Sequence, residues 1–258
     1  MFIILGYLIV GAGVFVSYVA MGGHLGALYQ PFEFTLIGGA ALGSYIASSN
    51  GASVKLLVEA FPKAIKRNPY GKPLYMELLA LLYTLLNKAR RDGLMSIESD
   101  IEDPKSSAIF SHYPLIQKDA KLMEFLTDYL RIMISGNMNS FEIETLMDQE
   151  IEALHNENHT PVNAVRAVAD ALPAFGIVAA VLGVVKALAA VDQPPAILAD
   201  LISKAMVGTF LGILLSYGFC APFASAVERQ SVAAIKVLEC VKVTLLASMN
   251  GYPPPLAV

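Results

Sequence analysis

Residues 205–226 read AMVGTFLGILLSYGFCAPFASA, an apolar run without a charged side chain. A helix needs about 20 mostly apolar residues to cross a bilayer, so this stretch predicts a membrane span. Residues 2–21 form a second uncharged apolar run, which a soluble fold does not explain. We therefore expect an integral membrane protein.

The composition supports this interpretation. Apolar residues make up 55% of the chain and charged residues 16%, with a mean hydropathy of +0.57, whereas a soluble chain has about 25% charged residues. The net charge of −4 provides no general basic surface for nucleic acid. No phosphate-binding loop, nucleophile elbow or paired CxxC motif occurs in the sequence, so we expect neither an enzyme nor a cofactor.

His155 and His159 stand four residues apart, a spacing that can hold a metal ion on one helix face. The Thr160-Pro161 pair, however, predicts a junction between two helices at this point. A solvated loop is the simpler interpretation, and we expect no metal site.

Two further runs complete the expected membrane part. Residues 171–191 are apolar except for Lys186, and residues 34–54 are apolar but diluted by glycine and serine. The weaker run could instead be a buried core helix of a soluble domain. Because no strand pattern competes, we expect an all-α membrane protein with four transmembrane helices, at about 2–21, 34–54, 171–191 and 205–226.

Basic residues predict the orientation. The linkers at 22–33 and 192–200 contain no Lys or Arg. The 55–170 segment carries several near its membrane ends: Lys55, Lys63, Lys66, Arg67, Lys72 and Arg166. Short loops rich in Lys and Arg face the cytoplasm. We therefore expect residues 55–170, and with four spans both termini, on the cytoplasmic side.

This arrangement divides the chain into four expected parts. They are a first transmembrane hairpin at 1–54, a helical cytoplasmic domain at 55–170, a second transmembrane hairpin at 171–226 and a helical cytoplasmic tail at 227–258. Apolar residues recur at helical spacing before and after the second hairpin. Spans three and four are therefore expected to extend into the cytoplasm.

Local signals place helices in the cytoplasmic domain. Pro114 and Gly136 bracket an expected helix at 115–135, with the glycine in the C-cap position. Asn139, followed three residues later by Glu142, resembles a capping box at the start of the next helix.

None of the expected spans contains an acidic residue. The nearest acids, Glu33, Asp170, Asp192 and Asp200, stand at or beyond the expected span ends. A protein that moves protons through the bilayer normally has a carboxylate or histidine there. Any ion-carrying group is therefore expected to come from another chain.

Spans three and four have features suited to receiving such a chain. Pro173 and Pro222 each remove a backbone donor and bend a helix, at a similar expected depth. Gly208 and Gly212 stand four residues apart, a spacing that lets another helix approach closely.

Thr209 places a hydroxyl in the middle of span four, and Tyr217 lies two turns further along. The pair is a candidate lining for an ion path. The alternative for Thr209 is a hydroxyl that bonds the carbonyl of its own helix four residues earlier, and spacing alone leaves both interpretations open.

Several of these segments resemble a known family. They match the signature of MotA flagellar stator subunits, within the MotA/ExbB/TolQ superfamily, at residues 90–93 with Glu98, at residues 172–180, and at residues 205–214 followed by Pro222. The resemblance extends over essentially the whole chain.

The resemblance implies a stator subunit of the bacterial flagellar motor, in the inner membrane. Such subunits form a ring, expected to be a pentamer around a dimer of MotB-type subunits, and the single span of each MotB-type subunit supplies an aspartate. Protonation of that aspartate drives the ring against the rotor protein FliG. The missing carboxylate is therefore expected from the partner.

The resemblance also assigns expected roles to residues. Pro173, Thr209 and Pro222 correspond to the ion path, with Tyr217 beside them. Gly176, Ala180, Gly208 and Gly212 are expected to pack against a partner helix. Arg90 and Glu98 correspond to the charges that act on FliG.

Both charges also have a simpler interpretation, because Arg90 can stabilise a helix end and Glu98 a helix start through the helix dipole. Exposed charges contribute little static affinity, but they suit a contact that forms and breaks repeatedly.

The ion and the wider function have alternatives. Sodium-driven, PomA-like relatives carry a threonine where this chain has Ala179, and Na⁺ needs several oxygen ligands, so we favour protons. An ExbB/TolQ-like subunit that energises outer-membrane processes is the second hypothesis, although the apolar first hairpin argues against such a three-span chain. A passive membrane scaffold is the third.

Overall fold

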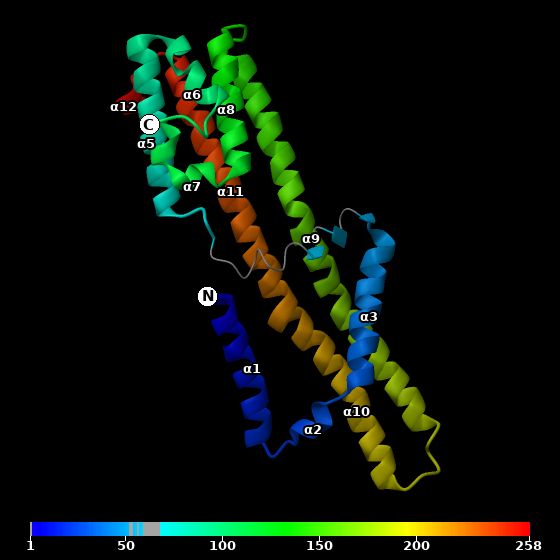
Figure 1. Cartoon of the computed structure of the whole chain (residues 1–258). Coiled ribbons are helices and arrows are strands. Elements are labelled where there is room, and N and C mark those ends of the chain that lie inside the picture. The colour runs from blue at the N-terminus through cyan, green and yellow to red at the C-terminus, as the bar shows by residue number, and fades with distance from the viewer. Residues whose placement is uncertain (1, 52–53, 56, 59–67) are drawn as a thin grey trace. The chain divides into compact units, whose positions relative to one another are not determined.

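The computed structural model describes residues 2–51, 54–55, 57–58 and 68–258. Every regular element in these ranges is a helix, and none of these residues belongs to a strand (Figure 1). The expected all-α fold is therefore confirmed. Lys63, Lys66 and Arg67, which entered the predicted orientation, lie outside the described residues.

The chain forms two compact units, which we call unit 1 (Met1–Arg67 and His159–Arg229) and unit 2 (Asn68–Asn158 and Gln230–Val258). The N-terminal helices are α1 (Phe2–Ala20), α2 (Leu25–Leu28) and α3 (Pro31–Ser48). The middle elements are α5 (Lys72–Asp92), η1 (Leu94–Ile97), α6 (Glu98–Glu102), η2 (Phe110–His112), α7 (Pro114–Gln117) and α8 (Ala120–Ser135). The last are α9 (Ser140–Leu188), α10 (Pro195–Ile213), the π-helix η3 (Leu214–Cys220), α11 (Ala221–Met249) and α12 (Pro254–Ala257).

Three helices among the described residues are long and apolar enough to cross a membrane: Phe2–Ala20, Ser140–Leu188, and the continuous run Pro195–Met249. They contain the whole of predicted span four and most of predicted spans one and three, which end one and three residues past their helices. Helix α3, which occupies most of the predicted second span, is not among them; it contains Pro31 and Glu33 as well as glycines and serines. The count of four spans stays a prediction.

Helix α9 differs from the expected pattern. The sequence predicted a new helix at Thr160-Pro161, whereas α9 runs from Ser140 to Leu188 with Pro161 and Pro173 both inside it. A proline removes one backbone donor and crowds one carbonyl of the preceding turn. In α9 these local losses do not end the helix, because the residues on both sides of each proline remain helical. His155 and His159 therefore lie on one helix, and the described residues contain no metal-holding group of three or more His, Cys, Asp or Glu side chains.

Unit 2 has its own apolar core. Figure 1 shows α5, α6, α7 and α8 gathered around the C-terminal part of α11, and α5 alone contributes several fully buried leucines: Leu78, Leu81, Leu82 and Leu85. The expected helix at 115–135 is two helices, because Asp119 caps α8 by accepting a hydrogen bond from the Leu122 amide at 3.2 Å.

Two predicted helix boundaries in unit 2 are confirmed. Gly136 ends α8 in the left-handed conformation, with φ of 65°. Asn139 and Glu142 form the reciprocal capping box, because each amide donates to the other residue's side chain, at 2.9 and 3.0 Å. These contacts start α9.

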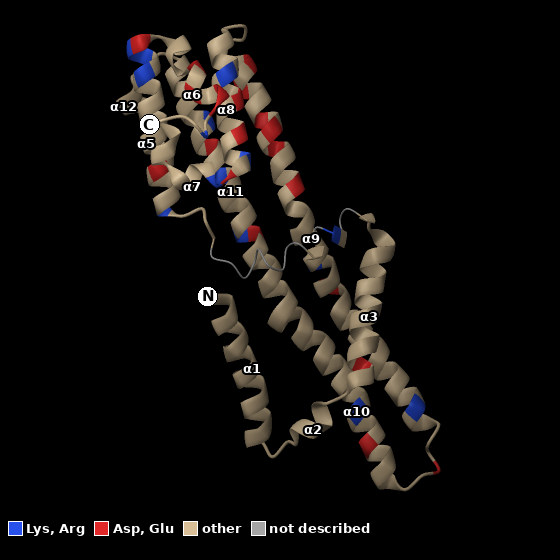
Figure 2. Ribbon diagram, in the orientation of Figure 1, with Lys and Arg blue, Asp and Glu red and all other residues tan. Residues whose placement is uncertain are grey.

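The two units differ in charge. Figure 2 shows Lys, Arg, Asp and Glu crowded on the helices of unit 2 and sparse on those of unit 1. Helices α1 and α2 carry none. The small apolar clusters of unit 1 pack α3 against α9, α10 and the start of α11.

Candidate ion path and partner contacts

Glycines bring α9 and α10 into backbone contact within unit 1: Gly183 meets Ala205 near one end, and three others meet along the middle. A Cβ added at Gly212 would lie 2.7 Å from the Leu172 carbonyl oxygen and 2.9 Å from the Gly176 Cα. A Cβ at Gly176 would lie 2.9 Å from the Gly208 carbonyl oxygen. Because the obstructing atoms are backbone, no side-chain rotation can relieve these contacts. We call Gly176, Gly208 and Gly212 the glycine interlock.

The glycine interlock bears on the expected packing residues. A Cβ at Gly208 would lie 2.9 Å from the Ala179 Cβ and 3.3 Å from the Ala180 amide nitrogen. The structure thus brings Gly176, Ala180, Gly208 and Gly212 together inside one chain. Their packing against a partner helix stays a prediction, and these glycines already have neighbours of their own.

The Thr209 hydroxyl differs from those of several helical threonines of the chain. Thr35 and Thr84, for example, donate to carbonyls of their own helices, at 2.6 and 2.8 Å. No hydrogen bond joins the Thr209 hydroxyl to any residue that the structure describes. The alternative in which this hydroxyl bonds its own i−4 carbonyl is therefore not what the structure shows.

The two prolines and Tyr217 occupy different settings. Pro173 is inside α9, directly after Leu172, whose carbonyl abuts Gly212. Pro222 follows the π-helix, in which the Ala221 amide donates to the Ser216 carbonyl. The spacing of apolar residues in the sequence did not predict this π-helix. Tyr217 lies within it and is 67% exposed.

Glu33 lies inside a helix. The sequence placed it at or just beyond the end of span two, and α3 begins at Pro31 and includes it; the bounds of span two stay a prediction. One carboxylate oxygen of Glu33 is buried without a hydrogen bond to any described residue, and it lies 3.3 Å from a Cβ position at Gly208. The position of Pro31, which can start a helix, was the available signal. Helix α3, which covers most of the predicted second span, therefore carries an acid, and its carboxylate lies near Gly208, the residue before Thr209.

Arg90 and Glu98, the expected rotor charges, both lie in unit 2. Arg90 is in the last turn of α5 and Glu98 begins α6. Neither forms an ion pair or side-chain hydrogen bond with another described residue. Neighbouring cations are paired: Lys88 Nζ lies 2.7 Å from Asp100, and Arg91 lies 3.0 Å from Asp92.

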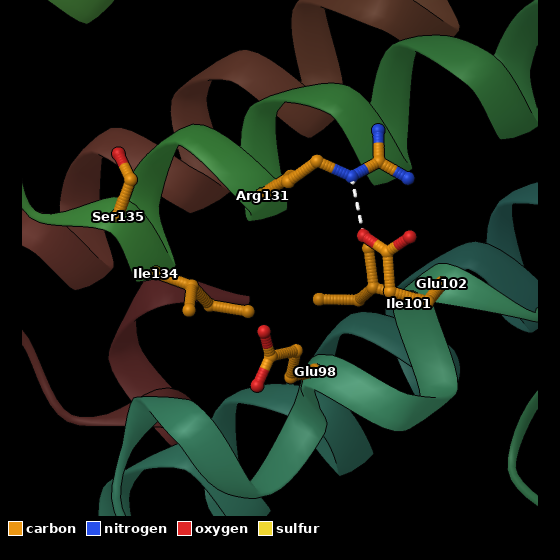
Figure 3. Close-up of a pocket in the computed structure, with 6 residues that line it drawn as sticks. All are labelled: Glu98, Ile101, Glu102, Arg131, Ile134 and Ser135. Atoms are coloured by element: carbon orange, nitrogen blue, oxygen red, sulfur yellow. Dashed lines mark hydrogen bonds and ion pairs between the residues drawn. The ribbon is translucent and has the colours of Figure 1, made fainter.

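Glu98 stands at a cavity of about 150 Å³ between α6 and α8 (Figure 3). Ile101 and Ile134 supply apolar walls, and their side chains point toward one another across it. On the far side, Arg131 donates to Glu102 at 2.6 Å, and it also donates to Asp128 at 2.7 Å. The cavity therefore offers one unpaired carboxylate beside a fixed, paired one.

Arg90 lines a second cavity, of about 420 Å³. The lining is mostly apolar and comes from both sequence segments of unit 2, including Leu86, Leu94, Met133 and Tyr252. The two predicted rotor charges thus each border a cavity, and the two cavities are lined by different residues.

A paired carboxylate, Asp100, connects the helix that carries Arg90 to the helix that carries Glu98. Asp100 is buried and accepts hydrogen bonds from Lys88 at 2.7 Å and from Ser107 at 2.6 Å. Burial would raise the pKa of Asp100, but the hydrogen bonds from Lys88 and Ser107 outweigh it and hold that pKa below its usual value. This pair ties α5 to the segment that carries Glu98.

Comparison with known families covers most of the chain. Residues 4–93 match the family model described as motility protein A N-terminal. Residues 117–240 match the MotA/TolQ/ExbB proton channel family.

Similar proteins span nearly the same length. The chain is 55% identical to motility protein A of Salmonella typhimurium strain LT2 and 53% identical to that of Escherichia coli K12, in both cases over 100% of this chain and 88% of the relative. It is 40% identical to the chemotaxis protein LafT of Vibrio parahaemolyticus, over 98% of this chain and 89% of the relative.

Two solved structures share the fold. The C. jejuni MotAB structure has a TM-score of 0.79 at 22% identity, and it covers 99% of this chain and 91% of that one. The flagellar MotAB stator complex from Bacillus subtilis has a TM-score of 0.78 at 24% identity, with 99% and 90% covered. By sequence and by fold, the chain belongs to the motility protein A family.

Proposed function

We propose that this chain is a stator subunit of the bacterial flagellar motor that forms a proton-driven channel with a MotB-type partner. The observation that carries the proposal is the family match, which includes a proton channel family model and relatives above 50% identity over the full chain. The chain is a multi-pass protein of the bacterial inner membrane and works as a motor and channel component, with no enzymatic reaction of its own.

The structure supports a division of labour between this chain and its partner. The glycine interlock holds α9 and α10 at backbone distance, so the pair can act as one rigid wall. Thr209, beside Gly208 on that wall, has a hydroxyl that bonds no described residue. A partner aspartate would supply the proton carrier, while Pro173, Thr209, Pro222 and Tyr217 would line its path.

A proton is the ion that this wall suits best. Ala179, at the position where sodium-driven relatives have a threonine, is 4% exposed and its Cβ faces Gly208. It therefore brings no oxygen to the path. A desolvated sodium ion needs several oxygen ligands, whereas proton transfer needs a carboxylate and water.

We further propose that Arg90 and Glu98 contact the rotor protein FliG. Their lack of partners within the described chain, beside the paired Lys88 and Arg91, supports an intermolecular role. The Glu98 cavity suits a cationic side chain, because Ile101 and Ile134 can contact its methylene groups while Glu98 accepts its hydrogen bonds.

The topology belongs to the same proposal. Four spans, at about 2–21, 34–54, 171–191 and 205–226, would place both termini and residues 55–170 in the cytoplasm. Copies of the chain would surround a MotB-type dimer as a ring, expected to contain five.

Complementation tests the function. The chain is expressed with a MotB-type partner in a Salmonella strain that lacks both stator proteins, and swimming and proton entry are measured. Restored rotation that stops when the proton gradient is collapsed is expected. Assembled but immobile flagella, with the complex present in the membrane, would contradict the proposal.

An ExbB/TolQ-like role is the second candidate, because the family model at residues 117–240 names those proteins too. The separate match of residues 4–93 to the motility protein A N-terminal model favours the flagellar stator. Restoring an ExbB- or TolQ-deficient strain instead of a stator-deficient one would reverse this preference.

A further inference from the structure

Helix α1 makes one polar contact with the π-helix that precedes Pro222. The Tyr7 hydroxyl donates a 2.8 Å hydrogen bond to the backbone carbonyl of Phe219. The rings of the same two residues also touch, with centroids 5.1 Å apart and planes tilted by 45°. Both residues belong to unit 1, although 212 positions separate them in sequence.

The contact extends one turn along α1. A Cβ at Gly218 would lie 3.2 Å from a methyl group of Val10. The absence of a side chain at Gly218 therefore lets α1 approach the π-helix. None of the residues of α1 is buried, so this helix is held at few points. The Tyr7 bond is therefore a directional contact on an otherwise loosely packed helix.

The π-helix Leu214–Cys220, which we call the wide turn, departs from regular helical hydrogen bonding, and the Tyr7 hydroxyl is a donor to it from another helix. A π-helix is rare and occurs mostly as a single turn at functional sites. Its i→i−5 bonds, and the missing donor of Pro222, disturb the regular pairing of carbonyls in the helix. In a bilayer no bulk water is present to satisfy a carbonyl, so a donor from another helix is valuable.

The register of this turn affects the proposed ion path. A π turn contains more residues than the 3.6 of an α-helix, so everything after it is rotated relative to Thr209. Tyr217 lies inside the turn and Pro222 directly follows it. Reverting to α-helical geometry would move both around the helix axis.

We propose that Tyr7 is a positioning residue for the ion path: its bond to the Phe219 carbonyl holds the wide turn and so determines how Tyr217 and Pro222 are presented relative to Thr209. The inference rests on the proposed stator function, but the contact itself can be tested without it. A hydrogen bond of ordinary strength shifts an equilibrium between two helix registers by about 2- to 12-fold.

Tyr7→Phe removes the hydroxyl and keeps the ring. Tyr18→Phe is the matched control, because Tyr18 lies on the same helix and its hydroxyl bonds no residue that the structure describes. In the complemented strain, Tyr7→Phe is expected to lower motor speed by about 2- to 12-fold and to shift its dependence on external pH, with unchanged amounts of complex in the membrane. Tyr18→Phe is expected to match the unsubstituted chain.

Thiol labelling provides a readout that needs no rotation. Cys220, next to Phe219, is a partly exposed free cysteine, and Cys240→Ala leaves it as the chain's remaining thiol. In the purified complex with its partner, Tyr7→Phe is expected to label Cys220 faster by about 2- to 12-fold, and Tyr18→Phe at the original rate.

The outcomes separate the two proposals. Equal labelling rates and equal speed–pH profiles for Tyr7→Phe and Tyr18→Phe would overturn the positioning role. Faster labelling without any change in speed or its pH profile would also overturn it, since the wide turn would then be irrelevant to the ion path. If the unsubstituted chain supports no rotation while the labelling difference persists, the stator function fails and the Tyr7 contact stands.

Discussion

The α9–α10 contact in unit 1 and the α5–α6–α8 surface in unit 2 achieve specificity by opposite means. In the first, backbone meets backbone at three glycines, and no charged side chain of α9 or α10 takes part. In the second, charged side chains pair across short distances, and Arg90 and Glu98 are left over. Contacts made by backbone tolerate no added atom, whereas contacts made by long side chains on a surface can adjust. The two regions should therefore respond very differently to substitution.

The largest expected effect is at the glycine interlock. Gly212→Val places branched carbon atoms against the Leu172 carbonyl and the Gly176 Cα, and this overpacking should cost about 3 kcal/mol. Loss of the complex from the membrane, measured by immunoblotting, and complete loss of swimming are expected. Gly39→Val on α3 is the control, because a Cβ there meets nothing within 4 Å. Normal swimming of Gly212→Val would show that the helices can separate at little cost.

The next effect is at the Lys88–Asp100 pair. Lys88→Met leaves the buried Asp100 carboxylate with Ser107 alone, which should cost about 1–3 kcal/mol of stability. Thermal unfolding of the detergent-solubilised complex measures it, and Lys105→Met, on an exposed turn, serves as control.

The same pair predicts a pH dependence. The pKa of Asp100 is lowered in the folded chain, so its stabilisation is present above the ordinary aspartate pKa and is lost as the pH falls through the folded value. Lys88→Met should therefore remove part of the acid sensitivity of the melting temperature. An unchanged acid profile in this variant would argue that Lys88 does not hold the Asp100 pKa down.

A smaller effect on stability, but a clear one on function, is expected at Thr209. Thr209→Val keeps the shape and removes a hydroxyl that bonds no described residue, so assembly should be normal. If the hydroxyl helps protons along the path, motor speed should fall by about 2- to 12-fold, the range of one hydrogen bond. Thr35→Val removes a hydroxyl that bonds its own helix and should have less effect. A scaffold without an ion path predicts no ion-dependent change in either.

The smallest effect on stability is expected at Glu98. Because Glu98 has no partner among the described residues, Glu98→Gln should change the free energy of unfolding by no more than about 0.5 kcal/mol. Single-motor torque, in contrast, should fall. Glu144→Gln, exposed on α9, is the control. Unchanged proton entry with reduced torque would assign Glu98 to the rotor contact; reduced proton entry would instead place its effect in the ion path.

Much of the fold was predictable because its signals are local. The uncharged runs predicted α1 and the α10–α11 region, and the Gly136 and Asn139–Glu142 signals predicted the boundary between α8 and α9. These features depend on residues a few positions apart. The helical class of the chain therefore followed directly from composition and spacing.

Other features depend on contacts that periodicity does not contain. Pro161 was expected to start a helix, yet α9 continues through it. Glu33 reaches Gly208 because α3 packs on α10, a relation between residues far apart in sequence. The wide turn at Leu214–Cys220 lies in an apolar run whose residue types do not distinguish a π-helix from an α-helix. The unpaired state of Arg90 and Glu98 likewise needed the positions of every neighbouring charge.

The glycine interlock also constrains how this chain can evolve. Every missense change at Gly176, Gly208 or Gly212 adds at least a Cβ, and each position already has atoms within 2.9 Å of where that carbon would stand. No amino acid has a smaller side chain than glycine, so every substitution at these sites introduces a clash and neutral substitutions are not expected there. Change there requires two helices to alter together, and single-residue libraries of this protein should return glycine at all three positions.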